Sequence, residues 1–204
     1  NLSMNILILG GSGSGKSERA EEAAVRLSGG ENLWYLATMR RDGDEADARI
    51  GRHRALRQGK GFVTIEKPVL AGEIAERQDV RSGTVLLECL SNWVANELFP
   101  LPADGLEDPF GQPEGAVDYL YRRLEGGISE LMAACKNLVI VSNDIFSEGL
   151  LHGDGKDDIY IQSYLRVLGL LNQYIAKKAD KVYEVAVGIA IARKGEAWPF
   201  SVHS

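Results

Sequence analysis

Residues 7–24 read LILGGSGSGKSERAEEAA, and their centre, Gly10 to Ser17, fits the pattern G-x-x-x-x-G-K-[ST] of a phosphate-binding loop. The apolar run before it, residues 4–9, is typical of a short buried strand. After it, residues 17–27 place three alanines and a leucine on one face, which indicates a helix. Because phosphate loops join a strand to the N-terminus of a helix, the sequence predicts a nucleotide site at this point.

The residues of the loop have separate expected roles. Glycines let backbone N–H groups turn inward around phosphate oxygens, and the helix N-terminus adds partial positive charge. We expect Lys16 to reach the β- and γ-phosphates and the Ser17 hydroxyl to ligate Mg²⁺. The nucleotide-binding residues predicted here are Gly10, Gly11, Ser12, Gly13, Ser14, Gly15, Lys16 and Ser17. The alternative is a glycine-rich turn without a ligand, and the loop alone does not choose among kinases, switches and transferases.

A phosphate loop usually works with an acid near the metal, placed at the end of a buried strand. Glu88 ends the apolar run TVLLE and is the better candidate for a nucleotide- and metal-binding acid. Asp144, which follows VIVSN, is the weaker candidate. The alternative for Glu88 is a strand-end carboxylate that faces solvent.

Strands alternate with helices along nearly the whole chain. We expect strands at residues 4–9, 33–37, 62–65, 83–89 and 137–143, and helices at 17–27, 44–58, 68–77, 91–98, 116–135 and 158–178. A loop rich in Pro and Gly spans residues 100–113, and the last two expected strands lie on either side of Gly188. This order predicts an α/β P-loop NTPase fold, with a mostly parallel sheet, helices on both faces and a C-terminal antiparallel strand.

Composition narrows the class of protein. The 204 residues predict one domain over 1–204, with a natural start at Met4 and residues 1–3 as a remnant. A net charge of −6 disfavours nucleic-acid binding. Cys89 and Cys135 form no C-x-x-C pair, which argues against a disulfide scaffold and is compatible with a reducing cytoplasm. No apolar run approaches the roughly 18 residues of a membrane helix.

Residues 49–60 read RIGRHRALRQGK, with five basic side chains and no acid. On a helix, Ala46, Ile50, His53 and Arg57 would share one face, so His53 is expected to point inward or into a cleft. A neutral imidazole is a good nucleophile toward phosphorus, and arginines such as Arg54 and Arg57 would neutralise triphosphate oxygens. The alternative is a solvated basic face with an incidental histidine.

The other two histidines carry weaker expectations. His152 lies in a glycine-rich loop and could touch a substrate, whereas His203 lies in the tail and is expected to be incidental. His53 is therefore the histidine that the sequence favours for catalysis.

The motifs together resemble one family. ILGGSGSGKSERAE, WYLAT, ARIGRHRALR, VLLECLSNWVANELF, VIVSND and LLNQYIAKKADKVYEVAVGI follow the order seen in the bifunctional adenosylcobinamide kinase / adenosylcobinamide-phosphate guanylyltransferases of cobalamin biosynthesis. The resemblance spans about residues 4–194. Its most specific element is the histidine in a helix of the form R-I-x-x-H-[RK], which ordinary P-loop kinases lack.

The resemblance implies a RecA-like P-loop domain, commonly a homotrimer, with ATP and GTP as substrates and Mg²⁺ as cofactor. Such an enzyme phosphorylates adenosylcobinamide and then transfers GMP from GTP through a guanylylated histidine, which gives adenosylcobinamide-GDP. His53 matches that histidine. Ala37, Thr38 and Met39 match a nucleotide-contacting strand end, and Glu66 and Glu88 match acids that serve guanine nucleotide binding.

Two segments depart from the family pattern. Asn143-Asp144 and then IFSEGLLHGDGKDD stand where the family has NE and a glycine-rich continuation. In YLRVLGLLNQ, Arg166 replaces an expected acid and Leu170 an expected arginine. These changes concern the corrinoid side or the kinase half and leave the guanylyl-transfer residues in place. Two alternatives to the family function stay open. One is a P-loop kinase for another small alcohol without guanylyltransferase activity, and the other is a non-catalytic nucleotide-binding protein.

Overall fold

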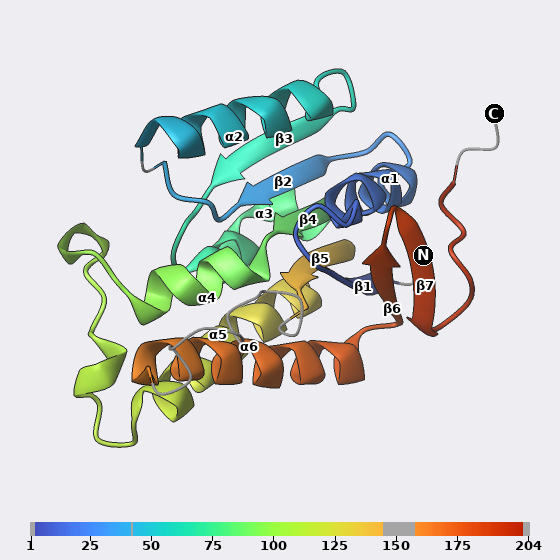
Figure 1. Cartoon of the computed structure of the whole chain (residues 1–204). Helices are drawn as coiled ribbons and strands as arrows, with labels where there is room; N and C mark the ends of the chain where they lie inside the picture. Colours follow the sequence, from blue (N-terminus) through green and yellow to red (C-terminus); the bar gives the residue numbers. More distant parts are fainter. Residues whose placement is uncertain (1–2, 42, 145–157, 202–204) are drawn as a thin grey trace.

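The computed structural model describes residues 3–41, 43–144 and 158–201 (Figure 1). Predictions made for His152, for His203 and for most of the departing segment after Asp144 therefore fall outside the described residues. The same holds for residues 1–2 and for the side chain of Ala46.

Seven strands form one sheet in the order β3-β2-β4-β5-β1-β6-β7. They are β1 (Met4–Gly10), β2 (Leu33–Ala37), β3 (Phe62–Glu66), β4 (Thr84–Glu88), β5 (Asn137–Asn143), β6 (Lys181–Ala186) and β7 (Ile189–Lys194). Every neighbouring pair is parallel except β6 and β7, which form the C-terminal antiparallel hairpin. The predicted mostly parallel α/β P-loop fold is confirmed.

Helices cover both faces of the sheet, as predicted (Figure 1). The α-helices are α1 (Lys16–Ser28), α2 (Gly43–Arg57), α3 (Gln78–Arg81), α4 (Leu90–Leu98), α5 (Ala116–Ala134) and α6 (Ile159–Lys178). Short 3₁₀ turns occur at η1 (Ala71–Glu76), η2 (Pro102–Asp104) and η3 (Pro109–Gly111). None of the helices in the described part of the chain is both long and apolar enough to cross a membrane.

The prediction of a helix over residues 68–77 is wrong. A 3₁₀ turn, η1, occupies residues 71–76, and Leu70 before it has a positive φ of 52°. An L-residue in that left-handed conformation interrupts α-helical geometry, so a helix cannot run through it from Pro68. Close packing also constrains this turn, because a Cβ on Gly72 would lie 2.5 Å from Gly127 Cα in α5.

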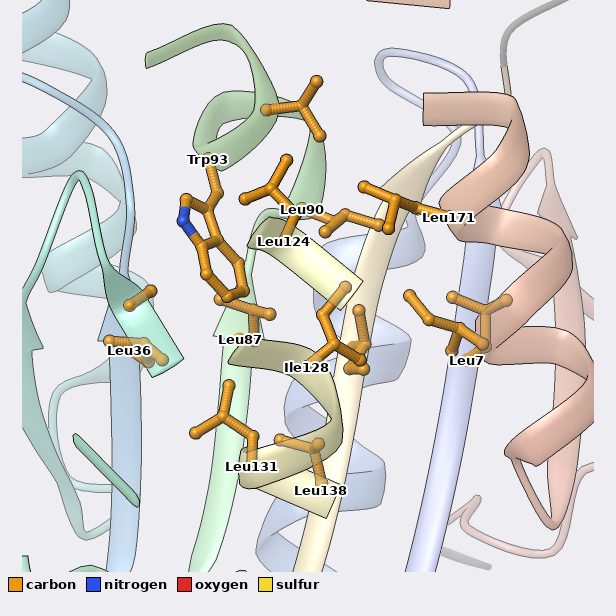
Figure 2. Close-up of a cluster of buried hydrophobic side chains, with 14 of the residues drawn as sticks. Leu7, Leu36, Leu87, Leu90, Trp93, Leu124, Ile128, Leu131, Leu138 and Leu171 are labelled. Atoms are coloured by element: carbon orange, nitrogen blue, oxygen red, sulfur yellow. The ribbon is translucent and has the colours of Figure 1, made fainter. Parts of the chain in front are cut away.

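Alternate strand residues point to two apolar layers, as the period of 2 requires. On one face, Leu7, Leu36 and Leu87 pack against α4, α5 and α6 in a cluster that includes Trp93 of α4 (Figure 2). On the other face, three alanines of α1 let that helix lie close to the sheet. α2 lies on this second side, above β2 and β3 (Figure 1). Each fully buried Leu contributes about 1.5–3 kcal/mol by leaving water.

Gly72→Ala is expected to lower the free energy of unfolding by about 1–3 kcal/mol, because its Cβ would overlap backbone that cannot move independently. Urea unfolding measures the change. Gly126→Ala is the matched control, since a Cβ there has nothing within 4 Å and sits inside α5. That control should be neutral or stabilising by up to about 1 kcal/mol. Equal destabilisation by both changes would contradict the packing argument.

Candidate functional site

The phosphate loop joins β1 to α1, as the sequence predicts. β1 ends at Gly10, Gly11 to Gly15 form the turn, and α1 begins at Lys16. Gly13 and Gly15 have φ values of 70° and 89°, which L side chains rarely adopt. The turn of the β6–β7 hairpin holds the loop from the other side, because Gly188 N donates a hydrogen bond to Ser14 O at 2.7 Å.

A pocket lies beside this loop, between α1, α2 and the carboxyl ends of β2, β3, β4 and β5. It brings together nine of the residues that the sequence singles out: Lys16, Ser17, Ala37, Met39, His53, Arg54, Arg57, Glu66 and Glu88. The carboxyl ends of parallel strands are where ligands bind in open α/β sheets. The pocket is therefore the candidate active site.

Thr38 lies behind the pocket rather than on its wall. Its side chain is fully buried, and its hydroxyl donates to Cys89 O at 2.7 Å and accepts from Cys89 N at 2.8 Å. Thr38 thus ties the end of β2 to the residue that follows β4. Any part that Thr38 takes in nucleotide binding would pass through its backbone or through the position of Cys89.

Glu88 turns toward the phosphate loop. Ser17 Oγ donates a hydrogen bond to Glu88 Oε1, and the Tyr35 hydroxyl donates to Glu88 Oε2 at 2.9 Å. Two donors on the two oxygens match an ionised carboxylate, which only accepts. Lys16 Nζ lies at the same end of α1 and donates to Gly11 O at 2.9 Å. This arrangement argues against the reading of Glu88 as an acid facing bulk solvent.

The oxygen atoms at this point fit Mg²⁺. The Ser17 hydroxyl and the Glu88 carboxylate are hard ligands that meet at the N-terminus of α1, where phosphates also bind. Asp144, the weaker candidate acid, is attached differently, since its backbone N donates to Gly10 O at 3.2 Å and its side chain is not on the wall of this pocket. Ser17 and Glu88 are therefore the residues that could hold the metal.

The strand ends on the α2 side carry a second acid. Glu66 ends β3, and its register partner Ala37 pairs in turn with Glu88, so the three strand ends lie side by side on one face. Glu66 forms ion pairs with Arg41 and Arg54. The hydrogen bond from Arg41, supported by the one from Arg54, lowers the pKa of Glu66 from its usual range. Glu66 is therefore a carboxylate held at the rim of the pocket.

The helix α2 places His53 and Arg57 on the wall of the pocket, as their spacing of four residues predicts. Two of their atoms, His53 Nδ1 and Arg57 Nη1, are buried and have no hydrogen-bond partner among the described residues. Arg57 is only 7% exposed, and its Cζ lies 3.4 Å from the centre of the Tyr35 ring. Buried polar atoms usually find a partner, so two unpaired atoms side by side on α2 set this wall of the pocket apart from an ordinary protein interior.

Four residues on the wall of the pocket were not predicted as site residues from the sequence: Tyr35, Thr64, Asn92 and Asn143. Tyr35 and Thr64 pair in the sheet and point to the same face as Ala37 and Glu66, two residues further along their strands. Asn143 ends β5, and its carbonyl accepts from Asn172 Nδ2 at 3.3 Å. The strand ends were a usable signal for Asn143, but the order of the strands, which places Tyr35 beside Glu88, cannot be read from the sequence.

Two solved structures match the chain only at low sequence identity and with TM-scores below 0.5. The P4 protein of bacteriophage phi6 in complex with ADP is 14% identical, with a TM-score of 0.41, and the match covers 92% of this chain and 52% of that one. The flagellar accessory protein FlaH of Methanocaldococcus jannaschii is also 14% identical, with a TM-score of 0.46 and coverage of 98% and 83%.

Relatives of known function match over nearly the full chain. The bifunctional adenosylcobalamin biosynthesis protein CobU of Escherichia coli (strain K12) is 30% identical over 195 residues, which are 94% of this chain and 100% of the relative. The bifunctional adenosylcobalamin biosynthesis protein CobP of Pseudomonas aeruginosa is 30% identical over 198 residues, 95% and 99% of the two chains. The sequence profile of the family described as cobinamide kinase / cobinamide phosphate guanyltransferase matches residues 6–192. The chain therefore belongs to the cobinamide kinase / cobinamide phosphate guanyltransferase family of enzymes.

Proposed function

We propose that this chain phosphorylates adenosylcobinamide and then transfers GMP from GTP, through guanylylated His53, to adenosylcobinamide-phosphate. One observation carries the proposal: His53 lines the same pocket as Lys16 and Ser17 of the phosphate loop. A kinase for a small alcohol needs the loop but has no use for an imidazole beside it. The product of the two reactions is adenosylcobinamide-GDP.

In the kinase reaction, the substrate hydroxyl oxygen attacks the γ-phosphorus of ATP or GTP. The bond to the β–γ bridging oxygen breaks, the nucleoside diphosphate leaves, and the hydroxyl proton passes to solvent. Lys16 and the backbone N–H groups of the loop hold the phosphates, and Ser17 and Glu88 would hold Mg²⁺. When bound, that ion neutralises charge on the phosphate oxygens.

In the transferase reaction, an imidazole nitrogen of His53 attacks the α-phosphorus of GTP, and the bond to the α–β bridging oxygen breaks as pyrophosphate leaves. A phosphate oxygen of adenosylcobinamide-phosphate then attacks the same phosphorus, the P–N bond breaks, and the imidazole is regenerated. Arg54, whose side chain lines the pocket, would neutralise charge on the departing oxygens.

The thiol of Cys89 is another nucleophilic group on the wall of the pocket. Burial raises the pKa of this thiol, and its Sγ accepts a hydrogen bond from Asn92 N at 3.5 Å. Because the thiolate is the reactive form, a thiol kept protonated is a poor nucleophile. His53 is thus the better candidate for the covalent intermediate.

The remaining parts of the proposal follow the resemblance. Ala37, Thr38 and Met39 would contact the nucleotide at the end of β2, and Glu66 would contribute to guanine binding at the end of β3. The enzyme would work in the cytoplasm as a homotrimer. Light scattering on the purified protein tests the trimer.

Incubation with GTP labelled at the α-phosphate tests the transferase. The expected result is an acid-labile, hydroxylamine-sensitive label on the wild-type protein, which adenosylcobinamide-phosphate then removes. An unlabelled wild-type protein would contradict the guanylyltransferase proposal. Transfer of γ-label from ATP or GTP to adenosylcobinamide is measured separately, and its absence would contradict the kinase half.

A further inference from the structure

Tyr35 touches both halves of the site. It lies in β2 opposite Leu86 of β4, so Glu88 is the diagonal neighbour on the same face, within reach of a long side chain. The Tyr35 hydroxyl donates to Glu88 Oε2, and the other oxygen of Glu88 accepts from Ser17. One buried tyrosine thus fixes the orientation of the acid beside the phosphate loop.

The ring of Tyr35 contacts α2, the helix that contains His53. Of the α2 side chains that the structure describes, that of Arg57 is the buried one, and its Cζ lies over this ring, 3.4 Å from the ring centre. Two ion pairs also hold this end of α2. Arg54 pairs with Glu66 at the rim, and Lys60, just after the helix, pairs with Glu21 of α1, whose side chain is buried. The stack of Arg57 on Tyr35 therefore gives α2 a buried contact with the sheet.

The hydroxyl of Tyr35 suits the role of a donor. A phenol has one proton to donate, and here the hydroxyl donates it to Glu88 Oε2 at 2.9 Å. Tyr35 is 4% exposed and would contact neither phosphate nor substrate through its hydroxyl, which is already committed to Glu88. Its effect on the reaction would pass through its neighbours.

We propose that Tyr35 is a positioning residue that aligns the two halves of this site: its hydroxyl orients Glu88 for Ser17, and its ring seats Arg57 and with it the helix that carries His53. The inference rests on the proposed function, in which Glu88 takes part in both half-reactions and His53 takes part in guanylyl transfer alone. A single side chain then serves two separable tasks, and two substitutions at one position can separate them.

Tyr35→Phe keeps the ring and removes the hydroxyl. We expect the Mg²⁺ concentration for half-maximal rate to rise about fivefold in both half-reactions, because Glu88 loses one of its two donors. Tyr35→Leu also removes the ring. We expect it to slow guanylylation of His53 by a further factor of about ten or more relative to phosphorylation of adenosylcobinamide, because His53 loses its fixed place.

Matched controls lie outside the pocket. Tyr183→Phe removes another buried tyrosine hydroxyl, which donates to Glu196 O at 3.1 Å away from the pocket, and should leave the Mg²⁺ dependence unchanged. If Tyr35→Leu does not fold, Arg57→Met removes the stack from the other side while Tyr35 stays on Glu88. Its control is Arg77→Met, because Arg77 lies over the Trp34 ring at 5.1 Å.

Two results would overturn the inference. One is a Tyr35→Phe protein with the Mg²⁺ dependence of the wild type. The other is an equal loss of both half-reactions in Tyr35→Leu or Arg57→Met, which is what a purely structural residue would cause. The wild-type protein is assayed in parallel, so a wild type without guanylylation identifies a failure of the proposed function instead.

Discussion

His53→Asn is expected to abolish labelling of the protein by GTP labelled at the α-phosphate, by at least about 1,000-fold. The amide keeps a polar side chain of similar shape in the pocket but offers no nucleophilic nitrogen. Phosphorylation of adenosylcobinamide should continue, because the groups that we propose to act at the γ-phosphorus are Lys16, Ser17 and Glu88. Scintillation counting of acid-precipitated protein and of the separated corrinoid product gives the two rates.

Arg52→Asn is the control for this change, because Arg52 is an exposed neighbour of His53 on α2 and is not on the wall of the pocket. It should label like the wild type. Label that persists on His53→Asn would place the nucleotide on another residue, and Cys89 would be the first to test. Loss of both activities in His53→Asn, with a normal unfolding midpoint, would instead place His53 in the phosphoryl transfer step.

Local patterns predicted most of the fold. The phosphate loop, the buried strands and the hairpin around Gly188 each depend on residues close in sequence, and each formed as expected. α5 also continued through Gly126 and Gly127, although paired glycines weaken a helix. The structure explains why residue 127 is a glycine, since a Cβ at this position would meet the Trp93 ring at 3.0 Å. That tertiary contact cannot be read from the helix alone.

The site shows the same division between residues that local sequence predicts and contacts that depend on the fold. Lys16 and Ser17 follow from a contiguous motif, and Glu88 follows from its place at a strand end. The contact between Tyr35 and Glu88 joins residues 53 positions apart, and it exists because β2 lies between β3 and β4 in the sheet. The strand order decides which side chains at the strand ends become neighbours. The sequence therefore predicts the members of the site better than the contacts among them.

Glu88→Gln is expected to lower both half-reactions about 100- to 1,000-fold at fixed Mg²⁺, because it removes charge beside the phosphates. It also breaks the hydrogen-bond pattern, since an amide accepts through one oxygen only while Ser17 and Tyr35 both donate to this position. One hydroxyl would face an N–H group, and the side chain would lose its fixed orientation. Raising the Mg²⁺ concentration should restore only part of the rate.

Glu66→Gln makes the same substitution two strands away and serves as the contrast. Glu66 sits at the rim with Arg41 and Arg54 and has no contact with Ser17, so the Mg²⁺ dependence should stay within about twofold of the wild type. Its effect should fall on the preference for GTP over ATP in the labelling reaction. Steady-state rates over a Mg²⁺ series with each nucleotide separate the two acids. If Glu66→Gln raises the Mg²⁺ concentration for half-maximal rate as much as Glu88→Gln does, the metal is held at the rim and not at the phosphate loop.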